Sequence, residues 1–229
     1  MGQPIEEVSV LYVLRVSLPD RPGSLGQLAS ELGRLPADIV SLRVIDRDSF
    51  QAIDEICVEG EGLSPEKLRE AAQRAPSVMV ETVRRIARVP DPLGGLVLAD
   101  RLARGVGSPL LTLVEGLPDA LGAAWALALS VEADGAQVGA ASSEAPSPGL
   151  MDTPWLPLTK ARRLPLGEWA PMNWRMHRFE LAAAPLATAF DFVLIGRWAG
   201  MRFRPSELRQ LELLADMAIR SDRQVSATM

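Results

Sequence analysis

Cysteine and histidine are almost absent from this chain of 229 residues, which has one of each. The single cysteine, Cys57, excludes an intramolecular disulfide and favours a reducing compartment, so we expect a cytoplasmic protein. Glu55 and Glu59 lie two positions to either side of Cys57 and would raise the pKa of its thiol, which disfavours a catalytic thiolate. The one histidine, His177, has too few cysteines and histidines around it to complete a usual zinc site. We therefore expect neither a metal nor a cofactor.

Signatures of catalysis and nucleotide binding are also missing. The sequence contains no G-x-S-x-G motif, no P-loop and no G-x-G-x-x-G fingerprint. Nearly all of its 24 basic residues are arginines, but they are spread along a chain of net charge -5, which disfavours a nucleic-acid-binding surface. No apolar run reaches the roughly 18 residues that a membrane helix needs. These absences favour a non-enzymatic protein that binds neither nucleic acid nor a membrane.

The length and composition favour two domains. A chain of 229 residues with 48% hydrophobic residues can fill two small cores. The segment VPDPLGG, residues 89–95, combines prolines and glycines and is the best candidate for a boundary. We expect a first domain over residues 1–88, a linker over 89–95 and a second domain over 96–229.

The first domain alternates strands and helices. Residues 8–17, VSVLYVLRVS, place apolar side chains at every second position and predict a strand. An amphipathic helix follows over 25–35, two strands that meet in a hairpin follow from Asp38, and a second helix begins after the N-cap Ser64. The segment VMVETVRRIARV predicts a closing strand. The order β-α-β-β-α-β predicts an α+β ferredoxin-like sandwich, with both helices on one side of a single sheet.

The turn between the first strand and the first helix, LPDRPGSL at residues 18–25, has a backbone that a ligand can approach. Pro22 stiffens the turn, Gly23 has no Cβ, and the first turn of the helix points unpaired N–H groups outward, where a carboxylate fits. This turn, the segment LPADIVSLRV and the order of elements resemble an ACT domain, a regulatory module that in many relatives binds an amino acid. The resemblance covers about residues 8–88 and implies dimerisation. It also implies a ligand site made by the turn and by the opening of the second strand: Asp20, Arg21, Gly23, Ser24, Leu25, Asp38 and Ile39.

Asp38 departs from the ACT pattern, because many relatives have an asparagine where this chain reads LPADIV. An amide both donates and accepts hydrogen bonds, whereas an ionised carboxylate only accepts them. Asp38 would therefore favour an ammonium or guanidinium group and repel an α-carboxylate placed beside it. The alternative is a turn that only caps the helix and an Asp38 that lies on the surface, as in ACT domains that only dimerise.

The second half predicts two helices, two strands around Asp134-Gly135, a long irregular stretch over 145–176, two more strands and a closing helix, FRPSELRQLELLADMA. This order over about residues 96–222 resembles a GAF domain, a small-molecule-sensing fold with an antiparallel sheet and flanking helices. The stretch 145–176 lacks a cysteine for bilin attachment, and the cyclic-nucleotide-binding pattern of GAF domains is not evident. The tryptophans of this stretch either form an apolar lid over a pocket or serve as core and surface anchors.

Together these patterns predict a regulatory protein that senses an amino acid or a similar small molecule through the ACT-like domain. We expect a homodimer through that domain, with the signal passed within the dimer or to a separate protein partner. The alternative is a ligand-free assembly protein in which both folds serve only as dimerisation surfaces. An enzyme would need the tryptophan-rich stretch and His177 to build its active site.

Overall fold

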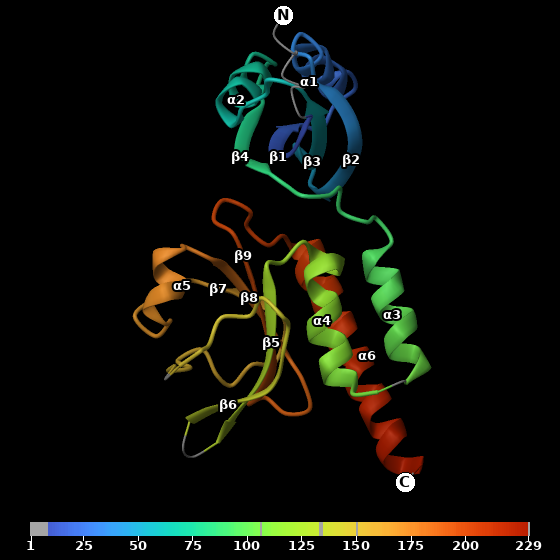
Figure 1. The fold of residues 1–229 in the computed structure, drawn as a ribbon, viewed down its shortest axis with the longest axis vertical. Helices are drawn as coiled ribbons and strands as arrows, with labels where there is room; N and C mark the ends of the chain where they lie inside the picture. Colours follow the sequence, from blue (N-terminus) through green and yellow to red (C-terminus); the bar gives the residue numbers. More distant parts are fainter. Residues whose placement is uncertain (1–8, 106, 133–134, 150, 229) are drawn as a thin grey trace, which may run out of the picture. The chain divides into compact units, whose positions relative to one another are not determined.

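The chain divides into two compact units, each with its own β-sheet. The computed structural model describes residues 9–105, 107–132, 135–149 and 151–228. The N-terminal unit is Met1–Val89 and holds a four-stranded sheet; the C-terminal unit is Pro90–Met229 and holds a five-stranded sheet (Figure 1). No helix within the described ranges is long and apolar enough to cross a membrane.

The N-terminal unit has the predicted βαββαβ order. Its elements are β1 (Val10–Pro19), α1 (Ser24–Leu32), β2 (Asp38–Arg47), β3 (Gln51–Gly60), α2 (Pro65–Gln73) and β4 (Met79–Arg85). All strand pairs are antiparallel and the sheet order is β2-β3-β1-β4, so β2 and β4 form its edges. The prediction of an ACT-like α+β sandwich is confirmed for this unit.

Both helices pack on one face of this sheet because alternate residues of the strands are apolar. Leu14 of β1 and Ile56 of β3 are fully buried on that face, where they meet Leu28 of α1 and Leu68 of α2. Helix α2 begins after the predicted N-cap Ser64, whose hydroxyl accepts a hydrogen bond from a backbone N–H of the first turn. The alternation seen in the sequence therefore decides which face of the sheet forms the core.

The C-terminal unit is an antiparallel sheet with helices, as in GAF domains. Its elements are α3 (Gly94–Arg104), α4 (Pro109–Leu121), β5 (Trp125–Glu132), β6 (Gly135–Ala141), β7 (Arg162–Leu164), α5 (Met172–Met176), β8 (Glu180–Pro185), β9 (Asp191–Arg197) and α6 (Pro205–Thr228). The sheet order is β6-β5-β9-β8-β7. Helix α3 begins at Gly94, inside the segment 89–95 that the sequence predicts as a linker. Asp134 of the predicted hairpin lies outside the described residues, although β5 and β6 pair as expected.

The two faces of this five-stranded sheet are covered differently. Helices α4 and α6 cover one face and bury Leu113, Leu117 and Leu211 against it, and α3 packs on these two helices. The stretch 145–176 packs on the other face. It contains β7 and α5, which the sequence does not predict, because a strand of 3 residues and a helix of 5 residues are too short to show a period.

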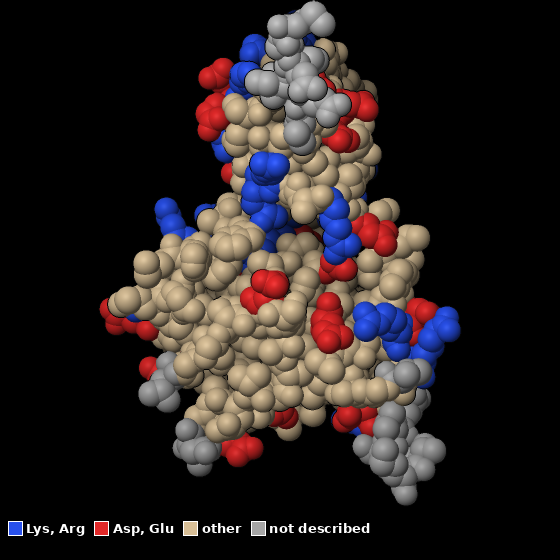
Figure 2. Space-filling model, in the orientation of Figure 1, with Lys and Arg blue, Asp and Glu red and all other residues tan. Residues whose placement is uncertain are grey.

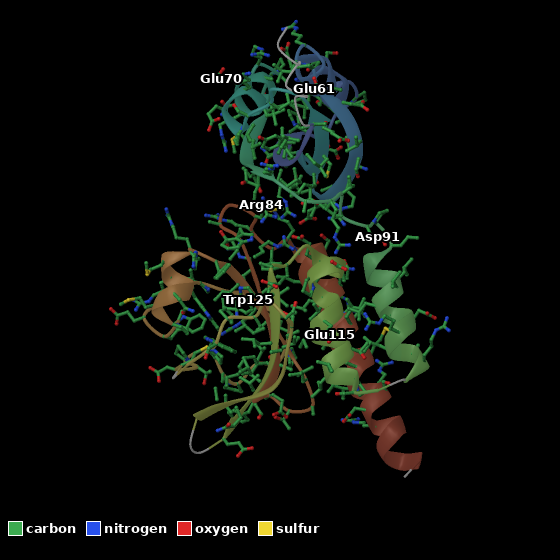
Figure 3. The ribbon with its side chains drawn as sticks, in the orientation of Figure 1. Glu61, Glu70, Arg84, Asp91, Glu115 and Trp125 are labelled. Atoms are coloured by element: carbon green, nitrogen blue, oxygen red, sulfur yellow. The ribbon has the colours of Figure 1, made fainter. Side chains whose placement is uncertain are left out.

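Trp155 and Trp174 of this stretch are core residues, as is Trp125 of β5. Trp125 at the start of β5, labelled in Figure 3, faces Trp174 of α5 with 4.9 Å between the ring centroids. Trp155 packs edge-on against Phe192 at 4.7 Å. Trp125 and Trp174 are 1% and 0% exposed, and Trp155 is 8% exposed. These rings pack on the face of the sheet that carries the stretch 145–176.

Candidate functional site

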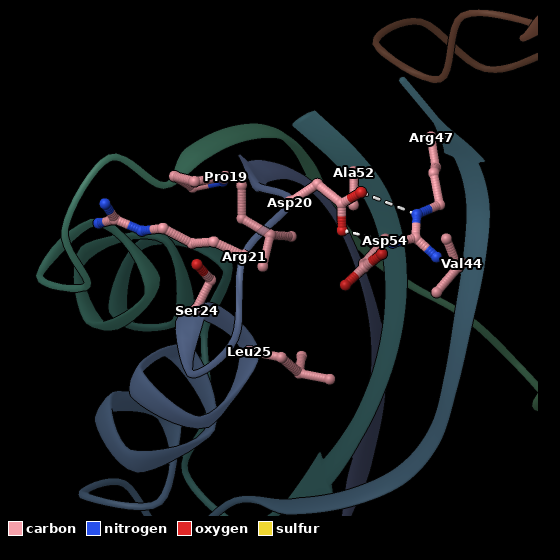
Figure 4. Close-up of a pocket in the computed structure, with 10 residues that line it drawn as sticks. Pro19, Asp20, Arg21, Ser24, Leu25, Val44, Arg47, Ala52 and Asp54 are labelled. Carbon is pink, nitrogen blue, oxygen red and sulfur yellow. Dashed lines mark hydrogen bonds and ion pairs between the residues drawn. The ribbon is translucent and has the colours of Figure 1, made fainter. Parts of the chain in front are cut away.

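The N-terminal unit contains a cavity of about 170 Å³ beside the turn that follows β1 (Figure 4). The turn and the start of α1 form one wall, and the adjoining ends of β2 and β3 form the other. The cavity is lined by Leu18, Pro19, Asp20, Arg21, Ser24, Leu25, Val44, Arg47, Ala52 and Asp54.

The turn is held open by its backbone geometry. The N–H of Asp20 donates to the carbonyl of Phe50 at 2.9 Å, which ties the start of the turn to the β2–β3 connection. Gly23 is the N-cap of α1 and has a φ of 89°, a left-handed conformation that suits glycine because it lacks a Cβ. It provides no side-chain cap for the helix, and a Cβ built on it would meet nothing within 4 Å. The turn thus leaves the start of α1 accessible.

An ion pair stands at the rim of the cavity. Arg47 of β2 donates to Asp20 through Nε at 2.8 Å and through Nη2 at 3.0 Å, drawn as dashed lines in Figure 4. The hydrogen bond and the charge of Asp20 raise the pKa of Arg47. The side chain of Arg47 is 67% exposed and that of Asp20 is 24% exposed. This bidentate pair joins the turn to the end of β2 at the solvent-facing side of the cavity.

Two residues that line the cavity each have a buried polar side-chain atom without a hydrogen-bond partner. These atoms are Oδ1 of Asp54, a residue that is 3% exposed, and Oγ of Ser24, a residue that is 6% exposed. Burial raises the pKa of the Asp54 carboxyl, and the nearby charge of Asp20 raises it further. Buried polar atoms of native proteins are nearly always hydrogen-bonded, so two unpartnered atoms on one cavity indicate a place for a polar group.

The structure brings together four of the seven residues that the sequence predicts for the site. Asp20, Arg21, Ser24 and Leu25 line the cavity, and Gly23 adjoins it as the N-cap. The other two predicted residues stand elsewhere: Asp38 and Ile39.

Asp38 and Ile39 lie at the opposite end of β2. Asp38 pairs with Glu59 of β3, whereas Arg47 pairs with Ala52. Nine residue steps of strand separate Asp38 from Arg47, or roughly 30 Å at the usual rise per residue. Within one chain, therefore, Asp38 and Ile39 do not contribute to this cavity.

Sequence reasoning missed the residues that β2 and β3 contribute. Val44, Arg47, Ala52 and Asp54 line the cavity from these strands. One signal was available, because Asp54 stands at a position that alternation assigns to the apolar face shared with Ile56. A carboxylate on the core face of a strand needs a partner or a function.

Cys57 and His177 are not among the residues that line the cavity. Burial, and after it the charge of Glu55, raises the pKa of Cys57 to about 11, which confirms the predicted direction. His177 packs against the rings of Phe179 and Trp198, each 5.7 Å away between centroids. Among the described residues, no three histidine, cysteine or carboxylate side chains gather as metal ligands would. Acidic and basic groups are interspersed on the face of the molecule that Figure 2 shows.

Comparison with known proteins gives a likeness of fold. No protein-family model matches the chain, and no curated protein matches it. Among solved structures, the chain is similar to the ACT domain of GTP pyrophosphokinase from Chlorobium tepidum, with 13% identity, a TM-score of 0.29, and coverage of 36% of this chain and 92% of that one.

Two further solved structures resemble the chain over longer stretches. A GAF domain from Pseudomonas syringae pv. tomato has 12% identity and a TM-score of 0.40, with coverage of 59% of this chain and 89% of that one. The chromophore-binding domain of the bacteriophytochrome RpBphP3 from R. palustris has 12% identity and a TM-score of 0.45, with coverage of 99% of both chains. The N-terminal unit thus resembles ACT domains in structure, and the C-terminal unit resembles a GAF domain.

Proposed function

We propose that this chain is a non-enzymatic regulatory protein that senses an amino acid, or a similar small zwitterion, in the cavity of its N-terminal unit. One observation carries the proposal: Oδ1 of Asp54 and Oγ of Ser24 are buried without partners on one cavity, beside the Asp20–Arg47 pair. A zwitterion supplies both the donors that these oxygens lack and a carboxylate that a guanidinium can bind.

The size of the cavity agrees with such a ligand. Its volume of about 170 Å³ equals that of about five or six waters in the liquid, and a cavity of about 150 Å³ can hold a molecule as large as benzene. An amino acid with a small side chain is of this size. The cavity also has an apolar side, made by Leu25 and Val44, against which a side chain of the ligand can pack.

The edge strand β2 supports dimerisation next to the cavity. Val40, Leu42 and Val44 on this strand are 39%, 39% and 55% exposed, and an apolar edge strand favours pairing with another strand. If two β2 strands pair antiparallel about a two-fold axis, Asp38 of the partner subunit comes next to the Arg47 end of the first. Asp38 could then act in the site across a homodimer, although it lies far from the cavity in its own chain.

The test is a thermal-shift screen of the purified chain against the proteinogenic amino acids, followed by calorimetric titration of each hit. Ala52→Leu places extra carbon atoms in the cavity and should abolish the response, whereas Ala87→Leu changes an exposed alanine and should preserve it. Ala52 is a better position than Gly23, where any side chain would strain the left-handed backbone. Full affinity in Ala52→Leu would contradict the proposed site.

The exposed apolar positions of β2 also favour the second candidate, a ligand-free assembly protein. In that case the screen would be flat while the chain remained a dimer. Sedimentation equilibrium measures the oligomeric state of the wild type and of Leu42→Lys. Together with the thermal-shift screen, it distinguishes amino-acid sensing from ligand-free assembly. A dimer that Leu42→Lys dissociates, without any small-molecule response, would favour assembly.

A further inference from the structure

We propose that the buried end of this cavity is an ammonium subsite, in which Oδ1 of Asp54 and Oγ of Ser24 accept hydrogen bonds from a primary ammonium group. This inference rests on the proposed function and adds the class and the orientation of the ligand. The ligand is a primary amine whose nitrogen lies at the buried end of the cavity, and any carboxylate of the ligand lies toward the rim.

Asp54 is the stronger half of the subsite. It lies on β3 opposite Val16 of β1 and Val44 of β2, on the face of the sheet that carries the core. It is 3% exposed, and its Oδ1 has no hydrogen-bond partner. An ionised carboxylate at such depth needs donors, and a primary ammonium brings three of them together with the opposite charge.

Ser24 provides the second acceptor from a different element. It is the first residue of α1 and is 6% exposed. Its backbone N–H already donates to the carbonyl of Arg21 at 3.3 Å, but its Oγ has no partner. Ser24 lines the cavity from the start of α1, and Asp54 lines it from β3 (Figure 4).

The charges around the cavity favour a cation at its buried end. Asp20 and Asp54 line the cavity together with Arg21 and Arg47; the carboxylate of Asp20 engages Arg47 at the rim, and Arg21 is exposed. The start of α1 contributes the equivalent of only about half a positive charge, which falls short of the full charge of an ionised Asp54. The raised pKa of Asp54, caused by burial and then by Asp20, also indicates that this place lacks a compensating positive charge.

The experiment is a two-dimensional ¹H–¹⁵N NMR titration of the full chain with three probes. Ethanolammonium chloride has charge and N–H donors, N-acetylethanolamine has the same carbon chain without charge, and tetramethylammonium chloride has charge without donors. We expect saturable shifts of the amides of Ser24, Leu25 and Asp54 with ethanolammonium. The other two probes should bind about tenfold to a hundredfold more weakly, because each lacks one half of a charge-assisted hydrogen bond.

Matched variants test the two acceptors. Asp54→Asn should weaken ethanolammonium binding by about tenfold or more, and Ser24→Ala should weaken it less, because its hydroxyl is neutral. Glu59→Gln removes an exposed carboxylate from the same strand and should leave binding unchanged. The spectrum of each variant without a probe reports whether it folds, and Ser24→Ala tests the subsite by itself if Asp54→Asn does not fold.

Three results would overturn the inference. The first is that Asp54→Asn binds ethanolammonium as tightly as the wild type does. The second is that propionate shifts the amides of Ser24, Leu25 and Asp54 at lower concentration than ethanolammonium does. The third is that no amine shifts these amides. Different results distinguish failure of the ammonium subsite from failure of the proposed sensing function. An amino acid that binds equally well in its N-acetylated form would reject the ammonium subsite and leave the sensing function standing, whereas a flat screen of all amino acids would reject both.

Discussion

The two units differ in the residues that lie beside their sheets. In the C-terminal unit, Trp125, Trp174 and Phe179 fill the face opposite the long helices, with 4.9 and 5.5 Å between ring centroids. In the N-terminal unit, a cavity of about 170 Å³ stays beside Asp54 and Ser24.

Both regions contain buried polar atoms without partners, but the atoms belong to residues with different surroundings. Trp125 and Trp174 belong to the cluster of apolar residues on their sheet face, whereas Asp54 and Ser24 line a cavity. An unpartnered atom therefore indicates a site only where there is room for its partner. Four variants can break or sharpen this comparison.

The largest effect is expected from Trp174→Ala in the filled face. Trp174 is 0% exposed and contacts Trp125, so its removal should lower the free energy of unfolding of the C-terminal unit by about 3–5 kcal/mol. Urea unfolding followed by tryptophan fluorescence measures this, because all five tryptophans lie in Pro90–Met229. Met172→Ala on the same short helix, where Met172 is 68% exposed, should change it by less than about 0.5 kcal/mol. A small loss in Trp174→Ala would mean that this face is loosely packed.

The next effect is expected from Gly196→Ala. A Cβ on Gly196 of β9 would overlap the ring of Trp125, which cannot move aside because Trp174 packs against it. Overpacking of this kind should cost about 1–3 kcal/mol in the same unfolding measurement. Gly139→Ala on β6 is the matched control, since its nearest neighbour would be a carbonyl oxygen at 3.8 Å. If both variants unfold alike, the close packing around Trp125 is not what limits stability.

The difference between the two units also explains how much of the fold could be predicted from the sequence. Period-two alternation in β1 and the apolar stripe of α1 predicted the βαββαβ unit, because local pattern and tertiary burial agree there. The stretch 145–176 shows no period, since its two short elements are ordered by packing against the sheet. Its fold was therefore beyond prediction from local pattern, although its tryptophans indicated burial.

The residues of the candidate site also divide into those that local sequence predicts and those that only the tertiary structure brings together. The turn residues Asp20, Arg21, Ser24 and Leu25 are adjacent in sequence, so one motif was enough to find them. The strand contributions come from the register of β2 against β3, which fixes which residues oppose the turn and which lie at the far end of the sheet. Register across a sheet is a tertiary property, and a single sequence does not state it.

A smaller effect, of opposite sign, is expected from Asp54→Asn in the N-terminal unit. Because the pKa of Asp54 is raised in the folded state, the folded chain holds this proton more tightly than the unfolded chain does. The stability contributed by Asp54 therefore falls as the pH rises from the ordinary aspartate pKa of about 3.9 through the raised value. Asp54→Asn should remove this loss and stabilise the unit by about 1 kcal/mol near pH 7.

Urea unfolding at about pH 4 and about pH 7, followed by NMR signals of β3, measures this difference. The control is Glu59→Gln, which neutralises an exposed carboxylate of the same strand. A loss of stability in Asp54→Asn at neutral pH would show that the carboxylate has a stabilising partner, and the reasoning from its unpartnered oxygen would then fail.

The smallest effect on stability is expected at the rim, from Asp20→Asn. Arg47 in the Asp20–Arg47 pair is 67% exposed, so loss of the ion pair should leave the free energy of unfolding nearly unchanged. The charge of Asp20 nevertheless raises the pKa of Asp54, as the smaller of two causes after burial. In Asp20→Asn the pKa of Asp54 should therefore fall part of the way toward its ordinary value, which ¹³C NMR of the Asp54 carboxyl can follow. An unchanged Asp54 titration would mean that solvent screens the rim from the buried end, so that the two carboxylates act as separate sites.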